Sequence, residues 1–207
     1  EPGAGTPPTV SIVTACYNSA GFLARTAASV RAQVGCEWEW ILVDDCSRDG
    51  SDALVRALAA ADPTRIRAVV LERNVGAVGA IARGIALASG EFTLILDHDD
   101  ELVPGALAAL LRLWRAHDGD HGRLLGVGGR CVDQDGRFLG TPLPVSPIVV
   151  NELDLRHRLR VRGELAGMIR TPVLRELYAD RGETMTNGLF WRRAARRIGL
   201  EPRMPHA

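Results

Sequence analysis

The sequence of 207 residues contains no lysine, and all 25 of its basic residues are arginine. This absence excludes a catalytic lysine, whether one that forms a Schiff base or one that binds phosphate in a P-loop. The arginines are balanced by 25 aspartates and glutamates, so the formal net charge is zero. Without a net positive charge, no general affinity for polyanions is indicated, and we expect no nucleic-acid partner.

The sequence also has few cysteines and no long apolar run. Cys16, Cys36, Cys46 and Cys131 form no CxxC pair, so we expect neither a zinc site nor disulfides, and a cytoplasmic protein is the simpler interpretation. No run approaches the ~18 apolar residues that span a bilayer, so no integral membrane segment is expected. The first residues lack an initiator Met and resemble no signal peptide, which suggests a trimmed chain or part of a longer one.

Short apolar runs alternate with amphipathic segments over the first half of the sequence. Runs typical of buried strands occur at 10–14, 40–43, 68–71 and 92–96. A segment with helical spacing follows each run, and Ser19 and Ser51 are placed to cap the first two helices. This alternation predicts an α/β fold with a mostly parallel central sheet flanked by helices on both faces.

The pattern becomes less regular after about residue 116. Further strands are expected at 125–132 and 164–170, a hairpin turn at Asp135-Gly136, and helices at 172–178 and 186–198. We interpret residues 1–207 as one domain, in which the regular half is 9–115 and the less regular half is 116–207.

Two clusters of carboxylates follow predicted strands. Asp44-Asp45 follows the second strand, and Asp97-His98-Asp99-Asp100 follows the fourth. In open α/β sheets, ligands bind beyond the carboxyl ends of the strands. Neighbouring carboxylates repel one another unless a cation is bound, and oxygen donors suit Mg²⁺ or Mn²⁺ better than Zn²⁺. We therefore favour a metal site at the second cluster, whereas Asp49 and Asp52 are attributed to turn formation.

Five motifs, in order, resemble family 2 glycosyltransferases. They are Val10–Asn18, Ile41–Gly50, Arg73-Asn74-Val75-Gly76, Ala88–Phe92 and Leu96–Asp100. The close resemblance covers residues 9–115. It implies a GT-A (Rossmann-like) fold and a nucleotide-diphosphate sugar donor, with a UDP-linked sugar expected. It also implies a bacterial enzyme of polysaccharide, glycolipid or glycoconjugate biosynthesis, working in the cytoplasm or at the inner face of the membrane.

The resemblance assigns nucleotide-binding roles to several residues. Ala15 and Tyr17 would line the nucleobase pocket, and Asp45 would accept a hydrogen bond from the base. Asp44 would support Asp45 or make a second contact. The segment near the nucleotide or the donor sugar would include Arg73, Asn74 and Gly76. Arg83 would either reach the same crevice or be a solvated helix residue.

The resemblance also identifies Asp97 and Asp99 with the DxD motif of the family. Asp99 is the expected direct ligand of Mn²⁺ or Mg²⁺, and Asp97 would bind the metal and the donor. Asp100 would hold a metal-bound water or a sugar hydroxyl. His98 belongs to the donor-binding set, but as a spacer between carboxylates rather than a metal ligand.

An inverting transfer needs a base that accepts the proton of the acceptor hydroxyl. The family has this carboxylate in an acidic motif of the second half, and Glu183 is the best match. Thr184 stands where the family usually has Asp, so Glu183 is either the base or a cap of the helix near Thr186. The hydroxyl acceptor itself, whether a glycan, a lipid-linked sugar or a small molecule, is not identified by the sequence.

Charge is unevenly distributed between the two halves of the sequence. Residues 1–101 contain 14 acidic and 8 basic side chains, and residues 102–207 contain 11 and 17. The arginines at 156, 158, 160 and 162 either face an anionic ligand or form a solvated surface. Two other functions remain as alternatives: a catalytically weak nucleotide-sugar-binding domain, and a sugar nucleotidyltransferase. The latter usually has a Gly-rich Arg/Lys signature near the first strand, which is absent here.

Overall fold

The computed structural model describes residues 9–117, 124–143, 146, 154–163 and 165–179. The described residues fall into two compact units. The first contains 9–117, 124–128 and 167–179, and the second contains 129–143, 146, 154–163 and 165–166. None of the helices in these ranges is both long and apolar enough to cross a bilayer.

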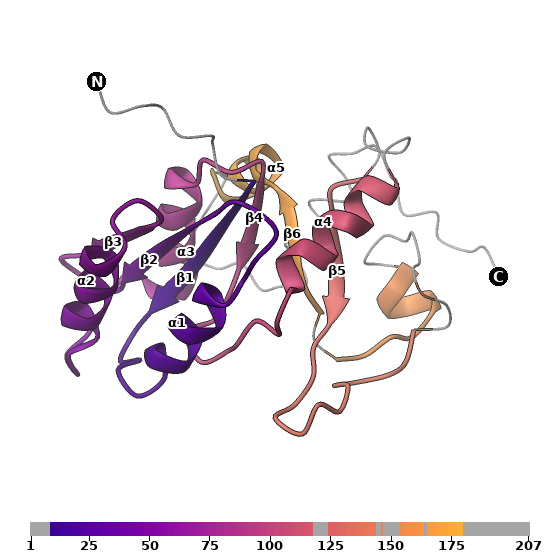
Figure 1. Ribbon diagram of the computed structural model, residues 1–207, viewed down its shortest axis with the longest axis horizontal. Helices are drawn as coiled ribbons and strands as arrows, with labels where there is room; N and C mark the ends of the chain where they lie inside the picture. Colours follow the sequence, from indigo (N-terminus) through magenta and orange to yellow (C-terminus); the bar gives the residue numbers. More distant parts are fainter. Residues whose placement is uncertain (1–8, 118–123, 144–145, 147–153, 164, 180–207) are drawn as a thin grey trace. The chain divides into compact units, whose positions relative to one another are not determined.

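A six-stranded sheet in the order β3-β2-β1-β4-β6-β5 forms the centre of the fold (Figure 1). Its strands are β1 (Val10–Cys16), β2 (Trp38–Asp44), β3 (Ile66–Val70), β4 (Phe92–Ile95), β5 (Gly126–Arg130) and β6 (Leu165–Arg170). The first four strands are parallel, and β6 pairs antiparallel with β4. Nearly every residue of β1 and β2 is buried, as their largely apolar sequences predict.

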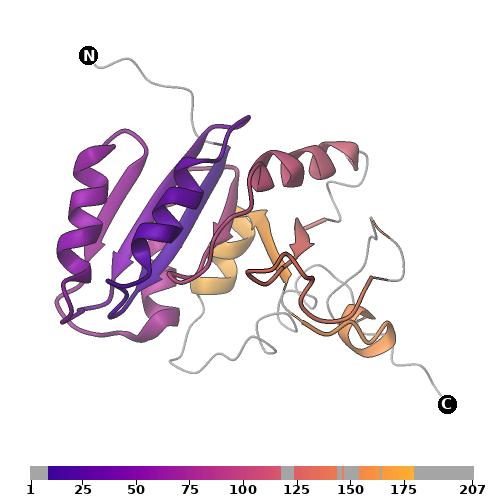
Figure 2. The same cartoon turned by 60° about the horizontal axis from the view of Figure 1, so that its bottom comes forward.

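Helices lie on both faces of this sheet (Figures 1 and 2). They are α1 (Leu23–Arg31), α2 (Ser51–Ala61), α3 (Gly76–Leu87), α4 (Ala106–Ala116) and α5 (Thr171–Ala179). The chain adds β2 and then β3 on one side of β1, and it returns through α3 to β4 on the other side. Since parallel crossovers are right-handed, this reversal separates α3 from α1 and α2, and it creates a topological switch point between β1 and β4.

Gly84 lets α3 approach the sheet closely. A Cβ atom at this position would overlap the side chain of Val13 in β1 and would lie 3.3 Å from Cγ2 of Val43 in β2. Glycine costs about 1 kcal/mol in a helix interior relative to alanine, so the close approach accounts for its presence here. The contact fixes α3 beneath β1 and β2, with the first turn of the helix near the carboxyl ends of the strands.

The second unit contains the predicted hairpin turn and a short π-helix, η2 (Asp154–Arg158). Val132 and Phe138 form an antiparallel bridge, and Gly136 between them has a φ of +77°. The carboxylate of Asp133 accepts hydrogen bonds from the backbone N–H groups of residues 135 and 137. The arginines at 158, 160 and 162 are exposed, as expected for a solvated surface.

The structure confirms the α/β fold class and the predicted alternation of strands and helices in the first half of the chain. It also confirms the predicted strand near 164–170 and the helix near 172–178, whereas the helix expected at 186–198 lies outside the described residues. The division into halves at residue 115 stays a prediction.

The two capping predictions are wrong. Phe22 precedes α1 without a side-chain cap, and Gly50 precedes α2 in a left-handed conformation. The Ser51 hydroxyl instead donates to Asp49, at 2.6 Å, and accepts the N–H of Ser19, at 2.8 Å. These serines are used to join the β1–α1 loop to the β2–α2 loop, and therefore they are not available as caps.

Candidate functional site

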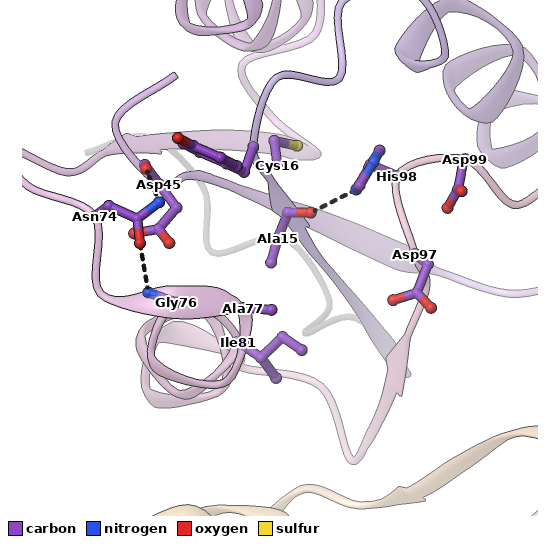
Figure 3. A pocket seen from close by; sticks show the side chains of 11 residues that line it. Ala15, Cys16, Asp45, Asn74, Gly76, Ala77, Ile81, Asp97, His98 and Asp99 are labelled. Atoms are coloured by element: carbon purple, nitrogen blue, oxygen red, sulfur yellow. Dashed lines mark hydrogen bonds between the residues drawn. The ribbon is translucent and has the colours of Figure 1, made fainter. Parts of the chain in front are cut away.

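A pocket of about 470 Å³ lies at the carboxyl ends of β1, β2 and β4, at the topological switch point (Figure 3). Its lining contains eight residues predicted from the sequence: Ala15, Tyr17, Asp45, Asn74, Gly76, Asp97, His98 and Asp99. Figure 3 shows Asp45, Asn74 and Gly76 on one side, Asp97, His98 and Asp99 on the other, and Ala15 between them. Segments up to 84 residues apart in the sequence therefore meet at one site.

The Asp45 side of the pocket is held together by hydrogen bonds. Asp45 is only 1% exposed, and its Oδ1 accepts the N–H of Val75 at 2.7 Å. Its carbonyl oxygen accepts a bond from Asn74 Nδ2 at 3.2 Å, and Asn74 Oδ1 accepts the N–H of Gly76 at 3.1 Å. The loop after β2 therefore fixes the start of α3, whose first turn becomes a wall of the pocket.

The opposite side is a tight turn that carries the acidic residues after β4, residues 97–100, which we call the acidic turn. The N–H of Asp100 donates to the carbonyl oxygen of Asp97 at 3.2 Å. His98 Nδ1 lies 3.3 Å from the Ala15 carbonyl oxygen, which only accepts, so Nδ1 must carry the proton in this bond. Burial raises the pKa of the Asp100 carboxyl, and the negative charges of Asp97 and Asp99 raise it further.

The carboxylates of the acidic turn suit a hard cation. Asp97 and Asp99 both line the pocket, and their oxygens are ligands that Mg²⁺ and Mn²⁺ prefer. Among the described residues, no three His, Cys, Asp or Glu side chains form a ready cluster for a metal. A site with one or two carboxylates is nevertheless what Mg²⁺ commonly uses when substrate phosphates and waters complete its coordination. The residues present therefore fit an ion that binds together with a diphosphate.

Asp44 and Cys16, at the ends of β2 and β1, are both buried, and Cys16 also lines the pocket. Asp44 is fully buried; its Oδ2 accepts the N–H of Ser47 at 3.0 Å, and its Oδ1 has no hydrogen-bond partner among the described residues. Burial raises the pKa of the Cys16 thiol to about 12; a hydrogen bond with Ser19 lowers it, and the nearby Asp44 charge raises it. Cys16 therefore stays protonated, and the role of Asp44 in supporting Asp45 stays a prediction.

Besides Asp44, four predicted residues do not line the pocket within the described structure. Arg73, Arg83 and Asp100 are exposed outside its lining, and Glu183 lies outside the described residues. The pocket also includes Cys16, Ala77 and Ile81, which sequence reasoning missed. Their signals are weak but present, because Cys16 lies between two predicted residues, and Ala77 and Ile81 share one face of the helix that begins at Gly76.

The mostly parallel sheet and its switch point define an α/β domain with the GT-A fold. Solved structures share this fold, including TarS of S. aureus, with a TM-score of 0.65, 23% identity and coverage of 90% of this chain and 55% of that chain. The mannosyltransferase PcManGT from Pyrobaculum calidifontis has a TM-score of 0.62 and 22% identity, with coverage of 93% and 52%.

The sequence profile described as "Glycosyl transferase family 2" matches residues 11–126, which is more than half of the chain. The chain belongs to this family. A similar protein is "Succinoglycan biosynthesis protein ExoO" of Rhizobium meliloti, 42% identical over 50% of this chain and 29% of the relative. "Putative teichuronic acid biosynthesis glycosyltransferase TuaG" of Bacillus subtilis is 38% identical over 45% and 37%. The chain thus matches only about a third of the length of these curated relatives.

Proposed function

We propose that this chain transfers a sugar from a nucleotide-diphosphate sugar to an acceptor hydroxyl, with inversion at the anomeric carbon and with Mn²⁺ or Mg²⁺ as cofactor. The observation that carries the proposal is the pocket itself, in which eight residues predicted to bind donor and metal meet at the switch point of the sheet. Family membership supports the same reaction class.

The two sides of the pocket suggest how the donor lies. Asp45 would receive the nucleobase, and Asp97 and Asp99 would face the diphosphate through the metal ion. TarS has been solved in complex with UDP and with UDP-GlcNAc, and PcManGT with GDP-Man and Mn²⁺. We infer a UDP-linked donor for this chain, and a GDP-linked donor is the outcome that would correct the nucleotide assignment.

The mechanism follows from the charge of the leaving group. As the acceptor oxygen bonds to the anomeric carbon, the bond to the diphosphate breaks, and negative charge grows on the leaving oxygens. A divalent ion supplies the neutralising charge when it is bound, and Asp97 and Asp99 would hold it. Glu183 would take the proton of the acceptor hydroxyl. Since the chain has no lysine, arginines are its only permanently charged cations for the diphosphate.

The relatives suggest the setting of the reaction. ExoO is named as a succinoglycan biosynthesis protein, and TuaG as a putative teichuronic acid biosynthesis glycosyltransferase. We infer a role for this chain in polysaccharide or glycoconjugate biosynthesis, with the acceptor still to be identified.

A thermal-shift screen of UDP- and GDP-sugars, with Mn²⁺ or with EDTA, tests the proposal. One donor should raise the melting temperature in Mn²⁺, because ligand binding to the folded state stabilises it. Asp99→Asn should lose the Mn²⁺-dependent part of the shift. Glu91→Gln is the matched control, because Glu91 is an exposed carboxylate immediately before β4 rather than after it. If no nucleotide sugar gives a shift, the proposal is wrong.

A transfer assay separates the enzyme from a weak binding domain. The identified donor, incubated with Mn²⁺ and a panel of glycan, lipid-linked and small hydroxyl acceptors, should give a glycosylated product and free nucleoside diphosphate. If the chain binds the donor but neither transfers nor hydrolyses its sugar, the binding-domain alternative is favoured.

A further inference from the structure

Three polar side chains of α1 and the turn after it lie against the segment between β4 and α4. They are Thr26, Ser29 and Gln33, which we call the α1 polar row. Thr26 is fully buried and Gln33 is 3% exposed, although the buried neighbours of Thr26 in the helix are apolar. Buried polar groups are normally hydrogen-bonded, so the partners of this row indicate its purpose.

The second half of the row binds the distal part of the segment. Ser29 Oγ accepts the N–H of Leu102 at 3.0 Å. Gln33 Nε2 donates to the carbonyl oxygen of Val103 at 3.0 Å, and its Oε1 accepts the N–H of Leu107 at 3.3 Å. These contacts join residues about 70 positions apart in the sequence, and each uses a backbone group of the segment or of the first turn of α4 rather than a side chain.

The first half of the row binds the acidic turn. The hydrogen bond that closes the turn joins Asp100 to Asp97. It does not use the carbonyl groups of the two central residues, His98 and Asp99. Thr26 Oγ1 donates to the His98 carbonyl oxygen at 2.7 Å, and Arg25 Nη2 donates to that of Asp99 at 3.4 Å. Arg25 is exposed, so its bond contributes little, whereas the Thr26 bond is short and partly buried.

The acidic turn needs such external support. Regular structure does not impose its shape, because β4 ends at Ile95 and α4 begins at Ala106. Three carboxylates within four residues also repel one another in the absence of a cation. The His98 ring gives a second anchor through the Ala15 carbonyl, so His98 is held by its backbone from α1 and by its side chain from β1.

We propose that Thr26 is a positioning residue for the metal and donor site. Its hydroxyl holds the His98 carbonyl, and the turn then presents the carboxylates of Asp97 and Asp99 together to the divalent ion. Thr26 does not line the pocket and acts only through the turn. The metal part of this inference rests on the proposed function, but the holding of the turn does not.

Three variants separate positioning from a general loss of stability. Thr26→Val keeps the shape of the side chain and removes the donor, and Thr26→Ser keeps the donor and removes a methyl group. The matched control is Thr93→Val. Thr93 lies in β4 and is 1% exposed, and this substitution removes its 2.9 Å hydrogen bond with the Thr171 hydroxyl. Thr26→Ala replaces Thr26→Val if the valine variant does not fold.

The first measurement is the Mn²⁺ concentration that gives half-maximal transfer. We expect Thr26→Val to raise it about tenfold, because the carbonyl loses its buried partner, and Thr26→Ser to restore it to within about threefold of wild type. Thr93→Val should leave it unchanged, even if the protein melts earlier. An unchanged value in Thr26→Val, or an equal increase in Thr93→Val, would overturn the proposal.

The second measurement does not depend on activity. In metal-free protein, hydrogen exchange of the Asp100 amide, which closes the acidic turn, should become at least about fivefold faster in Thr26→Val and not in Thr93→Val. Unchanged exchange shows that Thr26 does not hold the turn. Faster exchange in a chain that binds no donor would instead retain the turn-holding role and reject the proposed function.

Discussion

At the amino end of the central sheet a carboxylate is surrounded by hydrogen-bond donors, whereas at the carboxyl end carboxylates lie beside one another. Glu39, near the start of β2, accepts bonds from the Ser11 hydroxyl at 2.6 Å and from the Ser89 hydroxyl at 2.7 Å. Burial alone would raise the pKa of Glu39, but these bonds, the Ser89 N–H and the charge of Arg67 together lower it. The pKa of Asp100, at the other end, is raised.

Packing also differs between the amino and carboxyl ends of the sheet. A Cβ atom on Gly90, just before β4, would lie 2.7 Å from the backbone nitrogen of Ser11. A Cβ atom on Gly76, at the start of α3, would meet nothing within 4 Å. The amino end is thus closely packed and its carboxylate is satisfied, while the carboxyl end leaves space and negative charge for a ligand. The two ends of the same strands therefore differ in both packing and charge.

The largest effect that would test this comparison concerns catalysis. Replacing Asp97 or Asp99 by Asn should reduce the transfer rate about 100-fold or more, because the leaving diphosphate loses its metal-borne counter-charge. Unfolding by urea should change little in either variant. Steady-state kinetics with Glu91→Gln as the control would measure this, and a wild-type rate in Asp99→Asn without added metal would contradict it.

The next largest effect is on stability at the amino end. Gly90→Ala should lower the free energy of unfolding by about 2–3 kcal/mol, because the new methyl group overlaps the backbone of β1. Gly76→Ala should cost only about 1 kcal/mol, which reflects its φ of +77° in otherwise open space. Urea denaturation of both variants measures the two losses of unfolding free energy. Equal losses would contradict the difference in packing.

Glu39→Gln should lower the free energy of unfolding by about 1–2 kcal/mol at neutral pH, since the serine donors lose a charged acceptor. Binding of the nucleotide sugar should be unaffected, because Glu39 lies at the opposite end of β2 from the pocket. Chemical denaturation and donor titration of the same sample would test both statements. Weakened donor binding in this variant would show that the two ends are coupled.

The same carboxylate should make stability depend on pH. Its folded-state pKa is lowered, so its contribution is complete above the ordinary value of 4.5 and is lost as the pH falls through the folded-state pKa. The stability difference between wild type and Glu39→Gln should therefore shrink when the pH is lowered from 7 to about 3. A difference that stays constant over this range would contradict the sign of the shift.

The smallest effect is expected at Asp100. Asp100→Asn should raise the stability of the metal-free protein at neutral pH by about 0.5 kcal/mol or less, because one of three neighbouring charges is removed at an exposed site. Thermal melting with EDTA would detect the higher stability of the variant. The difference in stability between the variant and wild type should diminish when Mn²⁺ is bound to wild type. A decrease in stability would indicate that Asp100 has a stabilising partner.

Sequence reasoning succeeded where one residue type dominates a local environment. Uniform apolar runs identified the buried strands, and the carboxylates at their ends identified both sides of the pocket. Sequence reasoning failed where a side chain had more than one available hydrogen-bond partner. Ser19 and Ser51 have good capping chemistry, but tertiary contact between their loops offered them other bonds. Sequence patterns alone do not reveal such long-range choices.

The α1 polar row illustrates the same limit. Thr26 interrupts the otherwise apolar buried face of α1, and Gln33 is buried just after the helix, which signals that buried partners exist but not which ones. Their partners are backbone groups some 70 residues away, and backbone groups carry no sequence signal. The residues that carry charge in the site are therefore predictable, whereas the residues that hold them in place had to be found in the structure.

The buried thiol of Cys16 has a practical consequence for labelling. With a pKa of about 12, it has almost no thiolate at neutral pH, and it is inaccessible to solvent, so maleimide reagents should spare the pocket wall. Cys46 is partly exposed and follows Asp45 directly. A fluorophore on Cys46, with Cys36 and Cys131 replaced by serine, would report occupancy of the Asp45 side of the pocket while the pocket-lining residues remain chemically unmodified.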